Sequence, residues 1–139
     1  MDIFKELLRD FDDNFSFRET LSIGGMKSLA LSFPFLDQHN DCICIYVTKN
    51  KDSYLVTEDG FIGADWHSSY EREVHVRPFL DAFNLANCSP DRQIQYTPAD
   101  GFFVTTDEKH LASTIWMLLA FLVKYIGVIE YETTKVDKQ

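Results

Sequence analysis

The chain has 139 residues with 45% hydrophobic content, and its 22 Asp and Glu against 13 Lys and Arg give a net charge of −9. An aromatic content of 14% excludes a disordered chain and predicts one globular domain over residues 1–139. A negative surface repels phosphate backbones and anionic lipid headgroups, so we expect neither nucleic acid nor a membrane as a direct partner. The acid excess favours a protein partner with a basic surface, but it also maintains solubility, and both interpretations stay open.

Three cysteines, Cys42, Cys44 and Cys88, predict a reduced protein of the cytoplasm. Cys42 and Cys44 stand two apart on an expected strand, where a disulfide does not close readily, and the set matches no standard zinc spacing with the histidines. No metal or cofactor is therefore expected. The longest uncharged stretch, residues 110–123, is shorter than the roughly 20 residues that cross a bilayer, which predicts no membrane span.

The N-terminal third predicts a helix followed by strands. Apolar residues recur at helical spacing over residues 2–13, with charged residues between them. Residues 15–23 are typical of a strand, Gly24-Gly25 interrupts them, and residues 27–35 continue as a second strand or strand pair. Pro34 fits an edge strand or a strand end.

A central hairpin is the sharpest local pattern. Residues 42–47 and 53–57 are apolar strands joined by a polar loop, residues 49–52. That four-residue loop sets a register in which Asp59 lies across from Cys42. Because residues 42–47 are apolar on both sides, we expect this strand to be covered on both faces, with its cysteines in the interior.

A second helix and further strands follow. Pro78 fits the first turn of a helix that ends near Asn87. Residues 92–97 and 101–105 predict two more strands, joined by a turn over residues 98–101. The expected buried positions of the helix are Phe79, Leu80, Phe83 and Leu85.

The strongest helix is the last. Thr105 and Glu108 form a capping-box pattern, and apolar residues then cover most of the helical circumference from Leu111 to Ile126. Gly127 is the expected stop, followed by a strand-like stretch. A helix that is apolar on most sides packs against the sheet and against a second helix or subunit. The fold class expected is α+β, a mostly antiparallel sheet with an N-terminal helix and a long buried C-terminal helix packed on it.

Carboxylates gather at one end of the expected hairpin. Asp41, Glu58 and Asp59 are hard oxygen ligands that suit Mg²⁺, which makes a metal-dependent nuclease or phosphohydrolase using Asp41 and Asp59 one alternative. Glu58-Asp59-Gly60 is also an ordinary turn sequence, which we prefer. No nucleophile elbow or phosphate loop is present, so no catalytic residue is assigned and a non-enzymatic protein is expected.

The pattern from Phe33 to Gly60 resembles the family called domain of unknown function 1828. The matching residues are Phe33-Pro34-Phe35, Asp41, Ile43, Ile45, Tyr46, Tyr54-Leu55-Val56-Thr57 and Asp59-Gly60, and the likeness extends to the final helix. The chain departs from the pattern by an insertion-like segment, residues 61–76. The resemblance implies a small protein of bacteria, phages or mobile elements, and it carries over no catalytic residues.

These observations favour an inhibitor of a host defence protein, anti-CRISPR-like or DNA-mimic-like, in the cytoplasm of a bacterial host. Carboxylates would stand in for phosphates on the basic surface of the partner. The alternative to binding or metal chemistry is a structural homo-oligomer, with a homodimer formed through the helix that contains Trp116. The expected acidic contact residues are Asp10, Asp12, Asp13, Asp41, Glu58, Asp59 and Asp65, and Trp66 and Tyr70 are the expected aromatic contacts unless Trp66 covers the sheet edge.

Overall fold

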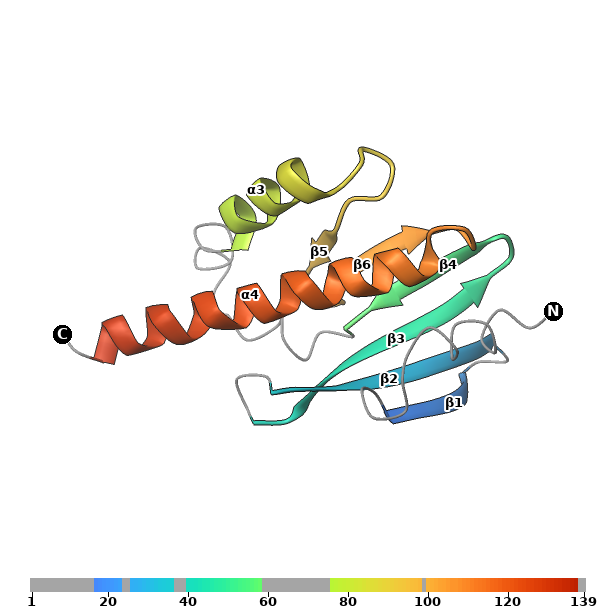
Figure 1. The fold of residues 1–139 in the computed structure, drawn as a ribbon, viewed down its shortest axis with the longest axis horizontal. Helices are drawn as coiled ribbons and strands as arrows, with labels where there is room; N and C mark the ends of the chain where they lie inside the picture. The colour runs from blue at the N-terminus through green and yellow to red at the C-terminus, as the bar shows by residue number, and fades with distance from the viewer. Residues whose placement is uncertain (1–16, 24–25, 37–39, 59–75, 99, 138–139) are drawn as a thin grey trace.

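The computed structural model describes residues 17–23, 26–36, 40–58, 76–98 and 100–137, with side chains described only between residues 28 and 128 of these ranges (Figure 1). The expected N-terminal helix, residues 2–13, lies outside them.

The described strands form one antiparallel sheet of six strands in the order β1-β2-β3-β4-β6-β5. The long helix α4 lies across the sheet, and α3 packs beside α4 (Figure 1). The α+β class, the antiparallel sheet and the packed C-terminal helix are therefore confirmed. The elements are β1 (Phe17–Ile23), β2 (Met26–Leu36), β3 (Cys42–Asn50), β4 (Ser53–Thr57), α3 (Arg77–Asn87), β5 (Gln95–Thr97), β6 (Gly101–Thr106) and α4 (Leu111–Asp137).

Strands β2 and β3 supply the centre of the sheet through directly paired apolar residues. Leu31 lies opposite Ile45 and Phe33 opposite Ile43, and all four side chains are buried. The register shifts after Phe33, so exposed Pro34 sits at an irregularity where its missing amide costs no regular ladder bond. Pro34 was expected at an edge strand or a strand end. The structure instead places it at a bulge-like register shift within β2.

The β3–β4 hairpin is tighter than expected. The ladder runs from Tyr46 opposite Thr57 to Asn50 opposite Ser53, which leaves only Lys51 and Asp52 in the turn. Lys51 has a φ of 57°, which fits a tight two-residue turn. The β3 ladder therefore extends to Asn50, two residues beyond the last pair that a four-residue loop allows. The predicted register was therefore wrong by two residues, although the same side chains face the core because strands alternate with period two.

The second face of β3 is not interior. Ile43, Ile45 and Val47 are buried, whereas Cys42 is exposed and Cys44 is half-buried. The expectation that both faces of this strand are covered was wrong for its described side chains. Apolar character on both faces did not decide coverage, because Cys is small enough to occupy a partly exposed position.

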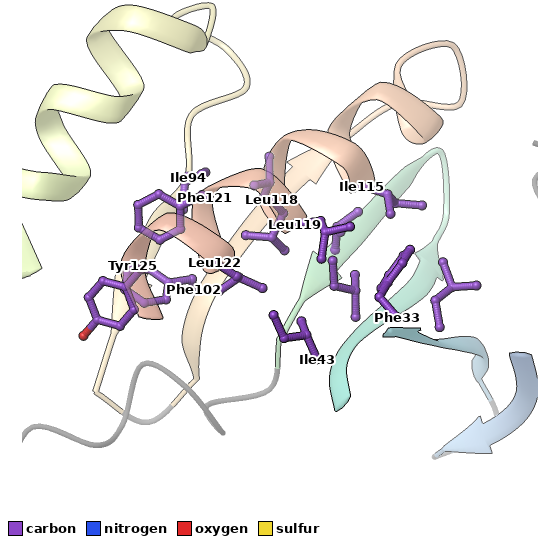
Figure 2. Close-up of a cluster of buried hydrophobic side chains, with 14 of the residues drawn as sticks. Phe33, Ile43, Ile94, Phe102, Ile115, Leu118, Leu119, Phe121, Leu122 and Tyr125 are labelled. Carbon is purple, nitrogen blue, oxygen red and sulfur yellow. The ribbon is translucent and has the colours of Figure 1, made fainter. Parts of the chain in front are cut away.

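A cluster of aromatic rings holds α4 on the sheet (Figure 2). The ring of Phe102, on β6, lies 4.7 Å from that of Phe121 and 4.8 Å from that of Tyr125, both on α4. Phe79 and Phe83, from α3, also contact Phe121. One core thus joins the sheet and both described helices.

Two details of the helices were predicted incorrectly. Leu85 on α3 is 88% exposed, and Asn84 takes the expected buried place because it lies one turn after Leu80. Helix α4 continues through Gly127 to Asp137, so the strand expected after Gly127 does not form. A single glycine costs a helix only about 1 kcal/mol, which the packed turns before it offset.

The apolar part of α4 is longer than the uncharged stretch suggested. An 18-residue window, Leu111–Val128, has a mean hydropathy of 1.8 and is long and apolar enough to cross a membrane by length and composition. Lys124 is the one charged residue in this window. The length of the uncharged stretch alone therefore underestimated the length of the apolar segment. Half of the window is buried within the fold, where Figure 2 shows its side chains meeting those of the sheet.

Candidate functional site

A polar hollow of about 320 Å³ opens between α3, the α3–β5 loop and the last two strands. Asp81 and Arg77 line it from α3 and Asp91 from the loop. Tyr96 of β5 and Thr105 of β6 line it from the sheet. Its lining is mostly polar and includes two carboxylates and one guanidinium, and a second guanidinium, that of Arg92, pairs with Asp91.

Asn84 fixes one wall of the hollow. This side chain is 7% exposed, and its amide nitrogen donates to the carbonyl of Ile94 at 2.9 Å. Its amide oxygen accepts the Ile94 N–H at 2.9 Å. The amide thereby pairs with the backbone as a neighbouring strand would, and it ties α3 to the segment that enters β5. Helical spacing from Leu80 was the signal that could have identified Asn84.

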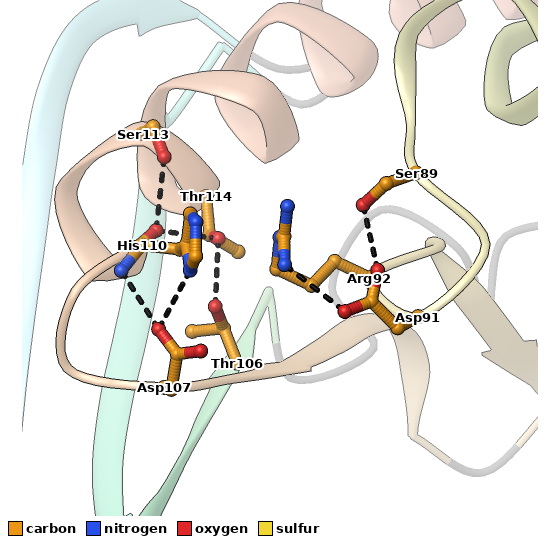
Figure 3. Close-up of polar contacts among 8 residues, drawn as sticks. All are labelled: Ser89, Asp91, Arg92, Thr106, Asp107, His110, Ser113 and Thr114. Atoms are coloured by element: carbon orange, nitrogen blue, oxygen red, sulfur yellow. Dashed lines mark hydrogen bonds and ion pairs between the residues drawn. The ribbon is translucent and has the colours of Figure 1, made fainter.

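Asp91 is held by two neighbours in the α3–β5 loop (Figure 3). Its Oδ1 accepts the Ser89 hydroxyl at 2.8 Å, and its Oδ2 lies 3.1 Å from the Arg92 guanidinium. The Ser89 hydrogen bond, assisted by the positive charge of Arg92, holds the pKa of the Asp91 carboxyl below its usual value. The hollow therefore presents an oriented carboxylate that stays ionised.

A carboxylate–imidazole pair lies beside this loop, in the turn that leads into α4 (Figure 3). Asp107 Oδ1 is 2.8 Å from His110 Nδ1 and accepts the His110 backbone N–H at 2.9 Å. The hydroxyls of Ser113 and Thr114 donate to the His110 carbonyl, at 3.0 and 2.7 Å, rather than bonding its ring. This arrangement caps the start of α4, and neither of these two hydroxyls is directed at the imidazole.

Asp107 thus performs the capping that was expected of Thr105 and Glu108. Thr105 lies within β6, two residues before Asp107, and lines the hollow, and Glu108 lies within the turn itself. The expected capping box was therefore wrong. Asp and Asn are effective caps because their short side chains reach the first free amides.

The Asp107 carboxyl predicts a specific pH response. Its pKa is lowered in the folded state, first by the hydrogen bond to the His110 ring and then by that to the His110 amide. Its contribution to stability is therefore complete above the unfolded-state pKa of about 4 and is lost as pH falls through the lower folded pKa. Asp107→Asn keeps a capping oxygen but does not titrate, so we expect it to lose less stability than the parent protein between pH 7 and about pH 3.

Urea unfolding at the two pH values measures this difference. Asp91 still titrates in the variant, so the acid loss should shrink without vanishing. A variant that loses as much stability as the parent protein would show that Asp107 makes no such contribution.

The residues predicted as acidic contacts are placed only in part. Asp41 is exposed, as a contact residue requires. Glu58 is 1% exposed, and its carboxylate accepts the Phe102 N–H at 3.0 Å, which continues the β4–β6 pairing where β4 ends. A buried carboxylate bonded to the backbone offers nothing to a partner, so Glu58 is removed from the acidic surface. The other predicted contacts, Asp10, Asp12, Asp13, Asp59, Asp65, Trp66 and Tyr70, lie outside the described residues.

The register of the hairpin also changes the metal hypothesis. The described β3–β4 pairs, such as Tyr46 opposite Thr57, belong to a register shifted by two residues from the predicted one. The predicted register, which placed Cys42 across from Asp59 and so brought Asp41 and Asp59 together, is therefore not the register of the described β3–β4 pairs. In the described part of the chain, no three His, Cys, Asp or Glu side chains group as metal ligands.

Charge on the described surface is nearly balanced. The described side chains include eight carboxylates and six Lys or Arg, a net charge of −2 within the total of −9. Most of the acid excess belongs to residues outside this part. The hollow is therefore a local arrangement of charge, not a section of a broad acidic surface.

The fold and the hollow define a small α+β domain with one antiparallel sheet, a long packed helix and a polar recess beside β5 and β6. The chain belongs to the family described as domain of unknown function DUF1828, whose model matches residues 33–124. The match covers β3, β4, α3, β5, β6 and the first half of α4, and it therefore includes the hollow. No curated protein and no solved structure matches the chain.

Proposed function

We propose that this chain is a non-enzymatic binding protein that recognises a protein partner with a basic surface, and that a basic side chain of the partner enters the polar hollow. The hollow carries this proposal. Asp81 and Asp91 line it from two different elements, and the second of these carboxylates is oriented by Ser89 and Arg92. A preorganised carboxylate binds a guanidinium or ammonium group without first losing side-chain freedom.

The shape of the hollow supports a protein partner over a small molecule. Sites for small molecules are mostly apolar and enclose most of the ligand. This hollow is polar and open, and the strongly exposed Leu85 lies on the same helix as Asp81. An apolar side chain beside polar groups is typical of a protein–protein contact.

The class of partner follows from charge and setting. A chain of net charge −9 attracts basic surfaces, which in bacterial cytoplasm commonly hold nucleic acid. Together with the phage or mobile-element setting implied by the family resemblance, this favours an inhibitor of a nucleic-acid-binding defence protein of the host. The charge of the described surface is nearly balanced. We therefore favour recognition of the partner by a few directed contacts, because mimicry of a whole phosphate backbone requires a more acidic surface.

A matched pair of variants tests the proposal. Asp81→Asn removes one carboxylate from the hollow, and Asp52→Asn makes the same change in the β3–β4 turn. We expect a basic protein captured from host lysate to bind the Asp81 variant about ten-fold more weakly, and the Asp52 variant nearly as tightly as the parent protein. Binding should also weaken as salt is raised. If the two variants bind alike, or salt has no effect, the hollow is not the contact.

A further inference from the structure

The side of α4 that faces solvent carries a regular stripe, which we call the outer stripe. Its residues are spaced alternately three and four apart, the spacing that keeps side chains on one line along paired helices. Each of them is exposed, although the window Leu111–Val128 has a mean hydropathy of 1.8. The outer stripe consists of Ser113, Trp116, Ala120, Val123 and Gly127.

Large and small residues alternate along the outer stripe. Trp116 and Val123 are 39% and 42% exposed, whereas Ala120 and Gly127 present almost no side chain. A Cβ built on Gly127 meets nothing within 4 Å, so the helix surface is open there. The Trp116 ring is 6.1 Å from that of Phe33 in the core, which limits its freedom and presents its outer edge as a fixed projection.

We propose that the outer stripe binds a second copy of this chain, with the two α4 helices antiparallel. In this arrangement Trp116 packs over Gly127 of the second copy, and Val123 packs against Ala120 of the second copy. Positions 116 and 127 and positions 120 and 123 are both centred between residues 121 and 122. One two-fold axis at that point therefore generates each pair twice, which gives four contacts. A surface that fits itself about a two-fold axis is what a symmetric dimer requires.

Charge complementarity favours the antiparallel copy. Position 130 of α4, a glutamate, continues the spacing of the outer stripe and comes opposite Ser113 in the first turn of the second copy's helix. Acidic residues near a helix N-terminus are favourable because that end carries a partial positive charge. Parallel helices would bring like ends together and place Trp116 on Trp116. Residues 111–128 contain one charge, Lys124, so the contact itself has little like-charge repulsion.

The dimer is independent of the proposed partner, because the outer stripe shares no residue with the hollow. The two associations also respond oppositely to salt. Binding of a basic partner weakens as salt rises, whereas two copies of net charge −9 repel less when screened. Failure of one proposal is therefore distinguishable from failure of the other.

Light scattering on the full chain in about 0.5 M salt tests the dimer. We expect twice the chain mass of 16.1 kDa at micromolar concentration. Ala120→Glu and Val123→Lys should each give monomers, because a charge is then buried without a counterpart. An equal mixture of the two variants should regain the dimer mass, since position 120 of one copy meets position 123 of the other.

Leu85→Glu is the control, because it changes an exposed apolar residue outside the outer stripe and should leave the dimer intact. Circular dichroism confirms that each variant is folded. The proposal is overturned by a monomeric parent protein up to about 50 μM, by a mixture that stays monomeric, or by an equal effect of Leu85→Glu. Flotation with phosphatidylcholine vesicles that is lost in Ala120→Glu would also overturn it, because a bilayer would then be the occupant.

Discussion

Replacing Phe102 by alanine is expected to lower the free energy of unfolding by about 3–5 kcal/mol, the range found when a fully buried phenylalanine is truncated. Phe102 is completely buried, and its ring contacts Tyr96 of β5 as well as Phe121 and Tyr125 of α4. The cavity left by the ring would open at the point where α4 meets the sheet. The loss should therefore affect the attachment of the long helix as well as the strand itself.

Urea unfolding followed by circular dichroism measures this loss, and Phe103→Ala provides the matched control. Phe103 is the next residue on β6, is only half-buried and faces the other side of the sheet. We expect its replacement to cost less than half as much. Equal losses at the two positions would contradict the placement of the core on the α4 side.

Replacing Asn84 by alanine is expected to lower the free energy of unfolding by about 2–4 kcal/mol. The change leaves both the N–H and the carbonyl of Ile94 without their buried partner, and each unsatisfied group costs about 1–3 kcal/mol. Water that enters the site would moderate the loss. Because Asn84 also lines the hollow, the variant should bind a basic partner more weakly than the parent protein does.

Asn87→Ala is the control for this effect. Asn87 ends the same helix, is exposed, and donates only to the Phe83 carbonyl at 3.1 Å. Its loss should cost about 1 kcal/mol or less. If Asn84→Ala is no more costly than Asn87→Ala in thermal or urea unfolding, the Asn84–Ile94 pairing does not hold α3 to the sheet.

The hollow and the outer stripe lie on different parts of the molecule, so the two proposals combine. A two-fold dimer formed through α4 would carry two hollows, each built within one chain. Two sites on one rigid assembly bind a partner with repeated basic surfaces far more tightly than one site does. Binding and dimer formation are thus separable by variants, with Asp81→Asn affecting the first and Ala120→Glu the second.

Local sequence patterns determined most of the elements and their type. The short apolar runs in β3 and β4, the proline in the first turn of α3 and the long apolar run in α4 predicted those elements, because each pattern reflects the geometry of a single helix or strand. The family resemblance carried by Phe33 to Gly60 was confirmed for the same reason, since it depends on that hairpin. The sequence also set the net charge, on which the class of partner proposed here depends.

Only the tertiary structure decided the hairpin register, the end of α4 and the candidate site. The two-residue turn at Lys51 exists because extra strand pairs offset an unfavourable φ, a balance that no local pattern contains. Gly127 stays helical because the turns before it are packed on the sheet. The hollow joins Asp81, Asp91 and Thr105 from three separate elements, and the burial of Glu58 depends on Phe102, which is 44 residues away. These features arise from contacts between distant segments, and such contacts exist only once the chain has folded.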